Sequence, residues 1–445
     1  NPIMKSFLIG LMALIIPLSE GASMEVKEIR QDGLKALMSE DHTVPVVSLR
    51  MVFDGGKRLV PEGKEGTAQL ASYLLMEGAG DLDAEAISDR MVELAANISF
   101  SAERDGFAVS ITSVSDAVLD AVDLALTMLT KANLAEEDLS RNRDQMLASI
   151  RRRMNDPQSL AFAALARTAY PDVSQGRGET RASVASLTRD DVQSYLDEQV
   201  QSAKLLVSVA GDLNEEKARQ ILARLASTLP QGKPMPAKEF HEMAGLGGQL
   251  LIPQDVPQST AVMAVPGLLR EDDDFLIAYV MNHILGGGGF SSRLTDEIRE
   301  QRGLAYSAAS FLAPSRETAG LMIYFATRND AVMDAVQVAK DVVADVALNG
   351  VTEEELRDAK DNLTGSYPLR FDSNGKIAGH LMGLQISGLP NDYHLTRNDL
   401  VEAVSNEDIK RVAKRLLGDF NPLLVVAGKP ENFTPSRTWD AEEIF

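Results

Sequence analysis

The stretch Leu134–Leu147, with the sequence LAEEDLSRNRDQML, is similar to Val351–Thr364, with the sequence VTEEELRDAKDNLT, which begins 217 residues later, at 351 rather than 134. The same offset relates LLVSVAGDL (205–213) to PLLVVAGKP (422–430). Self-similarity that returns at a fixed offset indicates a duplicated structural unit. The sequence therefore predicts two homologous halves.

A segment rich in proline and lysine separates the two halves. LPQGKPMPAKEF (229–240) interrupts the hydrophobic pattern that precedes and follows it. We predict an N-terminal half at residues 24–230, a linker at residues 231–240 and a C-terminal half at residues 241–445.

Short β-rich runs alternate with amphipathic helical windows in each half. Strands are predicted at 46–53, 107–114 and 321–327, and helices at 116–129 and 330–348. Helix N-terminal signals, a hydroxyl residue followed by acids, begin at Thr188 and Ser405. The pattern predicts the α+β class, with mainly antiparallel sheets flanked by helices.

The composition narrows the possible functions. The 445 residues include 44 Lys and Arg against 65 Asp and Glu, a formal net charge of −21 at pH 7. Such a charge repels phosphate backbones, so nucleic acid is not expected as a partner. The chain has no cysteine, which excludes disulfides, thiolate zinc sites and iron–sulfur clusters. Its five histidines are His42, His241, His283, His380 and His394.

The first residues have the three-part pattern of a secretory signal peptide. Lys5 precedes a nearly unbroken apolar run at 7–18, and small residues follow at Gly21 and Ser23. The apolar run is short for a membrane span. We predict a signal peptide at residues 1–23, no stable membrane span after its cleavage, and a periplasmic or secreted bacterial protein. The alternatives are an ordinary buried helix and an uncleaved anchor.

Three further segments, together with the repeat, resemble one family of enzymes. They are LMEGAG (75–80), ANISFSA (96–102) and GFSSRLTDEIREQRGLAYSAASF (289–311). The chain resembles the pitrilysin-type, insulinase-like zinc peptidases, and among them the subunits of the mitochondrial processing peptidase type and their bacterial relatives. The resemblance implies a clamshell in which each half holds two similar α/β subdomains, and in which two subunits enclose a peptide chamber.

The resemblance also locates the family's zinc site, whose ligands this chain lacks. The family carries His-x-x-Glu-His on the first long helix of the N-terminal half, and a distal glutamate ligand. The matching residues are Gln69 and Tyr73 at the histidine positions, Ser72 at the base position and Ser149 at the distal position. Amide, phenol and hydroxyl groups are not the donors that catalytic zinc needs. We therefore expect no metal and no other cofactor in this chain.

The family's catalytic pair in the C-terminal half matches Arg299 and Tyr306. A helix that ends at Gly303, followed by a strand, would present both side chains to one point. A guanidinium and a phenol there would donate hydrogen bonds to the oxyanion that forms when a peptide carbonyl is attacked. The alternative is that Arg299 only pairs with Asp296, and that Tyr306 only packs within its strand.

In the family a substrate peptide adds as a strand to a sheet edge beside the metal helix, through main-chain hydrogen bonds. The matching substrate-binding residues are Asn97, Ile98, Ser99, Phe100, Ser101 and Ala102. The alternative is an ordinary edge strand that the charged residues 103–105 protect from pairing.

A chain without zinc ligands that keeps the Arg–Tyr pair suggests that zinc comes from another chain. The resemblance implies a heterodimer with a homologous subunit that bears the HxxEH motif and holds the zinc, or possibly a homodimer in isolation. The expected function is a complementary subunit of a zinc metalloendopeptidase acting on peptides. The alternatives are a non-catalytic peptide-binding or scaffold protein of the cell envelope, and an active homodimer with an unrecognised metal site.

Overall fold

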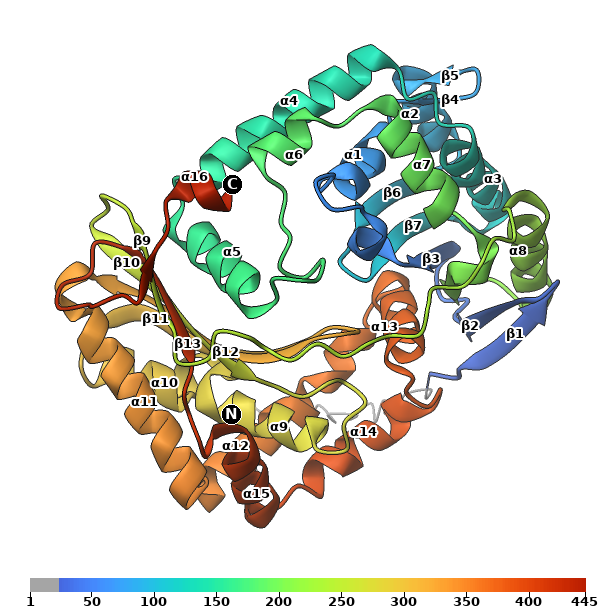
Figure 1. The fold of residues 1–445 in the computed structure, drawn as a ribbon. Coiled ribbons are helices and arrows are strands. Elements are labelled where there is room, and N and C mark those ends of the chain that lie inside the picture. Colours follow the sequence, from blue (N-terminus) through green and yellow to red (C-terminus); the bar gives the residue numbers. More distant parts are fainter. Residues whose placement is uncertain (1–23) are drawn as a thin grey trace, which may run out of the picture.

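The structure, a computed structural model, describes residues 24–445. The predicted signal peptide at residues 1–23 lies outside the described residues. The described chain forms two sheets, each covered by helices, that face each other across the molecule (Figure 1). This arrangement confirms the predicted α+β class with mainly antiparallel sheets.

The first sheet is built from the N-terminal half. Its order across the described residues is β1-β2-β8-β3-β7-β6, and only the β2–β8 pair is parallel. The strands are β1 (Lys27–Gln31), β2 (Leu34–Glu40), β3 (Val46–Asp54), β6 (Asn97–Ala102), β7 (Gly106–Val114) and β8 (Leu205–Gly211). A small separate hairpin pairs β4 (Gly78–Ala79) with β5 (Leu82–Asp83).

The second sheet is built from the C-terminal half. Taken in reverse, it repeats the order of five strands of the first sheet, whereas its sixth strand, β14, does not correspond to β1. Its described strands run β11-β12-β10-β13-β9-β14, and β9 is parallel to both of its neighbours. They are β9 (Gln249–Pro253), β10 (Gln258–Pro266), β11 (Ala305–Pro314), β12 (Ala319–Arg328), β13 (Leu423–Gly428) and β14 (Arg437–Thr438). The predicted strands coincide with β3, β7 and β12.

The helices follow the same duplicated plan. In the N-terminal half they are α1 (Thr67–Leu74), α2 (Ala84–Glu93), α3 (Val118–Thr130), α4 (Glu136–Arg153), α5 (Pro157–Ala169), α6 (Arg181–Ala185), α7 (Arg189–Gln199) and α8 (Glu215–Thr228). In the C-terminal half they are α9 (Phe275–Asn282), α10 (Arg293–Thr295), α11 (Val332–Asn349), α12 (Glu353–Gly365), α13 (Asn374–Ser387), α14 (Tyr393–Glu402), α15 (Asn406–Leu417) and α16 (Ala441–Ile444). The predicted helices coincide with α3 and α11.

In both halves a glycine occupies the equivalent position at the end of a strand. Gly211 ends β8 with φ 124°, and Gly428 ends β13 with φ 146°. A Cβ on Gly211 would lie 2.2 Å from the main-chain oxygen of Val46, and one on Gly428 would lie 2.1 Å from Oγ of Ser259. Both positions therefore require a residue without a side chain.

Each half covers the sheet of the other half with one helix. Helix α5 packs on β10 and β13 of the second sheet, and α13 packs on β3 and β8 of the first (Figure 1). The same 217-residue offset separates Pro157 and Asn374, the first residues of the two helices. The exchange buries β10 on both faces: Val262 joins the core that includes α5, whereas Met263 faces α9 and α11.

Hydroxyl caps begin several helices. Thr188 caps α7 and Ser405 caps α15, each in a reciprocal capping box with the acid three residues later.

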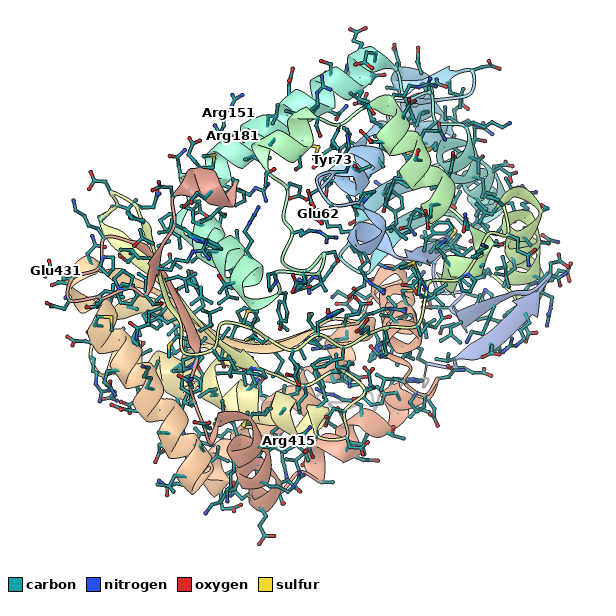
Figure 2. The ribbon with its side chains drawn as sticks, in the orientation of Figure 1. Glu62, Tyr73, Arg151, Arg181, Arg415 and Glu431 are labelled. Atoms are coloured by element: carbon teal, nitrogen blue, oxygen red, sulfur yellow. The ribbon has the colours of Figure 1, made fainter. Side chains whose placement is uncertain are left out.

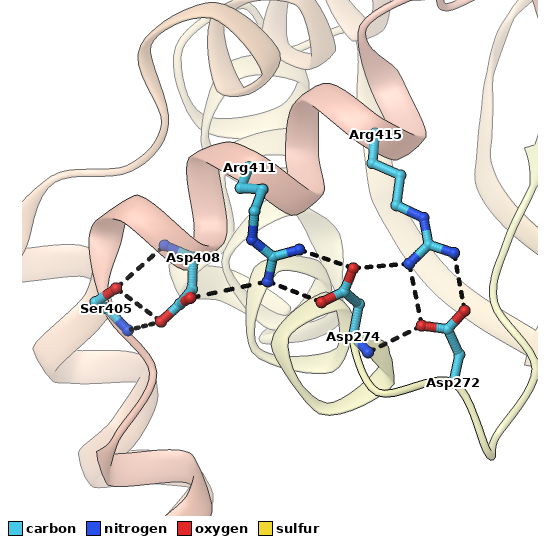
Figure 3. Close-up of polar contacts among 6 residues, drawn as sticks. All are labelled: Asp272, Asp274, Ser405, Asp408, Arg411 and Arg415. Atoms are coloured by element: carbon cyan, nitrogen blue, oxygen red, sulfur yellow. Dashed lines mark hydrogen bonds and ion pairs between the residues drawn. The ribbon is translucent and has the colours of Figure 1, made fainter.

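An ion-pair network holds α15 against the loop before α9 (Figure 3). Arg415 lies 2.8 Å from Asp272 and 2.7 Å from Asp274.

Candidate functional site

The three residues predicted to match the family's zinc ligands line one cavity. Gly66, in the left-handed region with φ 106°, starts α1, and α1 packs against α4. Gln69 and Tyr73, one turn apart on α1, line a cavity of about 430 Å³ together with Ser149 of α4. The side chain of Tyr73, which Figure 2 labels, is 42% exposed. The tertiary structure thus brings together side chains that lie far apart in the sequence.

Ser72, at the base position, turns inward instead. It is only 3% exposed, and its Oγ donates a hydrogen bond of 2.7 Å to the main-chain oxygen of Gln69. The same Oγ accepts a hydrogen bond of 3.2 Å from Nε2 of Gln69. Ser72 therefore serves as a hydrogen-bonding group within α1 and is not among the residues that line the cavity.

Cationic side chains surround this cavity. Lys57, Arg152 and Arg153 line it, with Glu179 as the only carboxylate among its lining residues. Nζ of Lys57 lies 3.0 Å from Glu179, and Nη1 of Arg153 lies 3.4 Å from it. Burial alone would raise the pKa of Glu179, but the charges of Lys57 and Arg153 outweigh it and hold the pKa below its usual value.

The residues of this cavity do not fit a zinc ion. Gln69, Tyr73 and Ser149 supply an amide, a phenol and a hydroxyl, and the Glu179 carboxylate is already paired with two cations. A dication here would also meet the positive charges of Lys57, Arg152 and Arg153. Within residues 24–445, no group of three or more His, Asp or Glu side chains is placed to hold a metal ion.

Arg299 lies in the C-terminal half, away from this cavity. It belongs to a π-helical turn over Asp296–Glu300 that follows α10, where the sequence predicts an ordinary helix. Its guanidinium carbon lies 4.6 Å from the ring centre of Phe290, and its Nε lies 3.4 Å from Glu300. The alternative prediction, an ion pair between Arg299 and Asp296, is wrong. In the described chain Arg299 forms its ion pair with Glu300.

Gly303 ends the turn after Arg299 in the left-handed conformation, with φ 60°, as predicted. Strand β11 then starts at Ala305, and its pairing with β12 is irregular between Ala305 and Ser307. Tyr306 falls at this irregularity. The residues that line the cavity with Gln69 do not include Arg299, so the oxyanion role of Arg299 and Tyr306 stays a prediction.

The predicted peptide-binding strand, β6, lies at the edge of the first sheet and packs beside α1. Ile98 is buried, whereas Asn97, Ser99 and Ser101 are exposed. The ring of Phe100 stacks on Phe107 at 6.5 Å between centroids. An edge strand with one face anchored and polar groups outside is competent for strand addition.

The charged residues around the cavity were not predicted from the sequence. Lys57 lies in a turn before α1, and Glu179 lies just before α6, so neither belongs to a motif. The run Arg151–Arg153 at the end of α4 was the available signal, because helix ends with adjacent cations place some of them toward neighbouring elements.

Two family models match the chain. The insulinase model, peptidase family M16, matches residues 35–180, and the peptidase M16 inactive-domain model matches residues 186–363. The duplicated two-sheet fold defines a peptidase-like clamshell protein. The chain belongs to the peptidase M16 family.

Relatives and solved structures agree with this over nearly the whole chain. The non-peptidase homolog YmxG of Helicobacter pylori is 25% identical, over 92% of this chain and 95% of that protein. An uncharacterized zinc protease of Streptomyces coelicolor is 27% identical over the same shares. The crystal structure of a peptidase M16 inactive domain from Pseudomonas fluorescens matches with a TM-score of 0.86 and 27% identity, over 93% of this chain and 100% of that one.

A protease from Helicobacter pylori has the same fold, with a TM-score of 0.82 at 17% identity, over 91% of this chain and 99% of that one. In the part of the chain that the structure describes, no helix has the length and apolar character needed to cross a membrane.

Proposed function

We propose that this chain is the subunit without zinc in a two-chain zinc peptidase of the bacterial cell envelope. A homologous chain with the HxxEH motif holds zinc, water and base, and this chain closes the peptide chamber. One observation carries the proposal: Gln69, Tyr73 and Ser149 line a common cavity but supply no zinc donors. The name of the related non-peptidase homolog of Helicobacter pylori supports the same reading.

Within this complex, Arg299 and Tyr306 donate hydrogen bonds to the oxyanion in the partner's active site. Support for Arg299 comes from its side chain, which is 36% exposed and fixed by Phe290 and Glu300. Gly303, as the left-handed end of the turn, keeps the turn and strand β11 adjacent. A substrate peptide pairs with the open edge of β6.

The test combines the purified chain with the HxxEH homologue of the same organism and measures peptide hydrolysis. Activity should need both chains, and metal analysis should find zinc in the HxxEH chain alone. Arg299→Ala and Tyr306→Phe should each lower kcat by about 10²-fold, the usual effect of losing one oxyanion donor.

Arg302→Ala is the matched control for this test, because Arg302 lies just after the same turn, is exposed and pairs with Glu297. It should leave kcat within about twofold, as expected for a surface pair. Full activity in both Arg299→Ala and Tyr306→Phe would refute the oxyanion role. Zinc bound stoichiometrically to this chain alone would refute the division of labour.

The open edge of β6 also favours a second candidate, a non-catalytic peptide-binding or scaffold protein. In this case a fluorescent peptide would bind the chain, as measured by anisotropy. A proline at Ala102 would weaken this binding, because Ala102 alternates with the residues that bond to β7 and its main-chain N–H faces the open edge. Binding without any hydrolysis in the presence of the HxxEH chain would favour this candidate over the first.

A further inference from the structure

A separate, open cavity of about 370 Å³ lies in the C-terminal half, lined mainly by α9, α13, α14 and the 3-10 turn η8 (Tyr367–Phe371). It shares no lining residue with the cavity at Gln69. We call it the arginine–tyrosine pocket after six of its lining residues, Arg270, Arg370, Arg397, Tyr279, Tyr367 and Tyr393. Its volume is in the range of small-molecule sites.

Each arginine of the pocket is held by a tyrosine. Nη2 of Arg270 donates to the hydroxyl of Tyr393 at 3.2 Å, and Nη2 of Arg370 approaches the hydroxyl of Tyr279 at 3.4 Å. The guanidinium carbon of Arg397 lies 4.5 Å from the ring centre of Tyr367.

Phenols orient a guanidinium without neutralising it. Within residues 24–445 none of the three arginines has a carboxylate within 4.0 Å, and no acid lines the pocket. Three positive charges therefore converge without compensation in a chain whose net charge is −21.

Carboxylates are present nearby but serve other arginines. Asp272 and Asp274 follow Arg270 closely in the sequence, yet they pair with Arg411 and Arg415 of α15 (Figure 3). The adjacent network is thus neutralised by its own acids, whereas Arg270 is left to the pocket.

The inner end of the pocket contains groups that lack partners. Arg397 is only 5% exposed, and its hydrogen bonds within the described chain, to Leu363 and Asn398, all use Nη1. Tyr367 is 6% exposed, and its buried hydroxyl has no hydrogen-bond partner in the described chain. Burying an uncompensated cation beside an unpaired hydroxyl is costly, so these groups point to a ligand that completes them.

We propose that the arginine–tyrosine pocket binds a small multivalent oxyanion, of the phosphate or polycarboxylate type. Guanidinium groups present paired N–H donors that match phosphate and carboxylate oxygens. Phe275, Leu276 and Leu384 also line the pocket, so the ligand's body can be apolar. The proposal does not depend on a partner chain or on peptidase activity.

The experiment titrates the full chain with pyrophosphate and, separately, with citrate, by calorimetry at constant ionic strength set with sodium chloride. At least one of the two should bind with one site per chain, and which one binds distinguishes phosphates from polycarboxylates. Arg370→Gln removes an exposed pocket cation, and Arg270→Gln a half-buried one. Each substitution should raise Kd by about tenfold or more, as expected for the loss of a charged hydrogen bond.

Two further variants isolate the pocket from general charge effects. Arg328→Gln removes an exposed arginine elsewhere, one that pairs with Asp330, and should change Kd by less than about twofold. Gly383 lines the pocket, and a Cβ there would meet nothing within 4 Å. Gly383→Leu should therefore fill the pocket and abolish binding. The variant should still fold, because leucine favours the helical conformation more than glycine does. Failure of both anions to bind, equal weakening by Arg328→Gln, or unchanged binding in Gly383→Leu would each overturn the proposal.

Discussion

The hydroxyl of Ser208, on β8 of the first sheet, donates a hydrogen bond of 2.7 Å to the main-chain oxygen of Ala378 on α13 of the other half. Nε2 of Gln385, further along α13, donates to the main-chain oxygen of Val207 at 2.8 Å. Leu381 is fully buried in the same contact. The two halves are therefore joined through the exchanged helix itself.

This contact predicts how the halves depend on each other. Leu381→Ala should lower the free energy of unfolding by about 2–5 kcal/mol through the cavity it leaves, and Ser208→Ala by about 1 kcal/mol. Ser227→Ala, an exposed serine on α8, is the control and should stay within about 0.5 kcal/mol. Urea denaturation measures all three. A Leu381→Ala chain as stable as the control would show that α13 is not part of the core.

The second prediction concerns Gln199, which is fully buried at the end of α7. Its Oε1 accepts from the main-chain N–H of Gly56 at 2.6 Å, and its Nε2 donates to the main-chain oxygen of Asp54 at 2.9 Å. Gln199→Leu keeps the volume but leaves these main-chain groups unpaired, so it should cost about 2–4 kcal/mol. The exposed Gln193→Leu is the control, and equal stability of the two variants would contradict the role of Gln199.

The network of Figure 3 predicts a stability change in acid. The hydrogen bonds from Arg411 lower the pKa of Asp274, and those from Arg415 lower it further. Together they outweigh burial, which by itself would raise this pKa. A carboxyl with a depressed folded pKa contributes stability that is present above its unfolded value, about 3.9, and is lost as pH falls through the folded value. The stability difference between the native chain and Asp274→Asn should therefore shrink below about pH 4. A pH-independent difference would exclude this linkage.

His380 predicts a change in a higher pH range. Burial, and then His394 and Arg370, lower its pKa from 6.5 to about 4. The unfolded chain then binds this proton more tightly, so stability is full above pH 6.5 and declines as pH falls toward 4. His380→Gln should remove this decline, as measured by thermal unfolding across the range. The same slope in both chains would contradict the prediction.

His42 offers a control of opposite sign. The hydrogen bond that the His42 ring donates to the carboxylate of Asp212 raises the pKa of His42 above 6.5. Its contribution is therefore present below pH 6.5 and is lost as pH rises through the folded value. His42→Gln should remove stability on the acid side, where His380→Gln restores it.

The last prediction reconstructs the zinc site. Gln69→His, Tyr73→His and Ser149→Glu together supply a His₂Glu set at one cavity and should confer zinc binding. Adding Arg152→Gln should tighten zinc binding several-fold, because it removes a cation from the cavity lining.

Arg151→Gln is the control for the reconstruction, since Arg151 lies on the same helix but is not among the lining residues, and Figure 2 shows it directed outward. Competition with a chromogenic chelator measures both affinities. Equal tightening by Arg151→Gln would reduce the effect to net charge, and no zinc binding in the triple variant would exclude the shared site.

Much of the fold follows from local patterns in the sequence. The period-two run of β7 and the helical periodicity of α11 each specify an element, and the hydroxyl residues Thr188 and Ser405 fix where α7 and α15 begin. The π-helical turn around Arg299 was not predictable, because its widened geometry depends on packing against β11 and α11 rather than on residue type.

The sequence by itself determined that the chain has two related halves, that it belongs with the insulinase-like peptidases, and that Gln69 and Tyr73 cannot replace zinc-binding histidines. These are statements about residue type and spacing, which the sequence carries directly. Only the tertiary structure decided that α5 and α13 exchange sheets, and that Lys57 and Glu179 adjoin Gln69. It also brought together Arg270, Arg370 and Arg397, because the meeting of side chains from distant segments depends on how whole elements pack, and no local pattern encodes it.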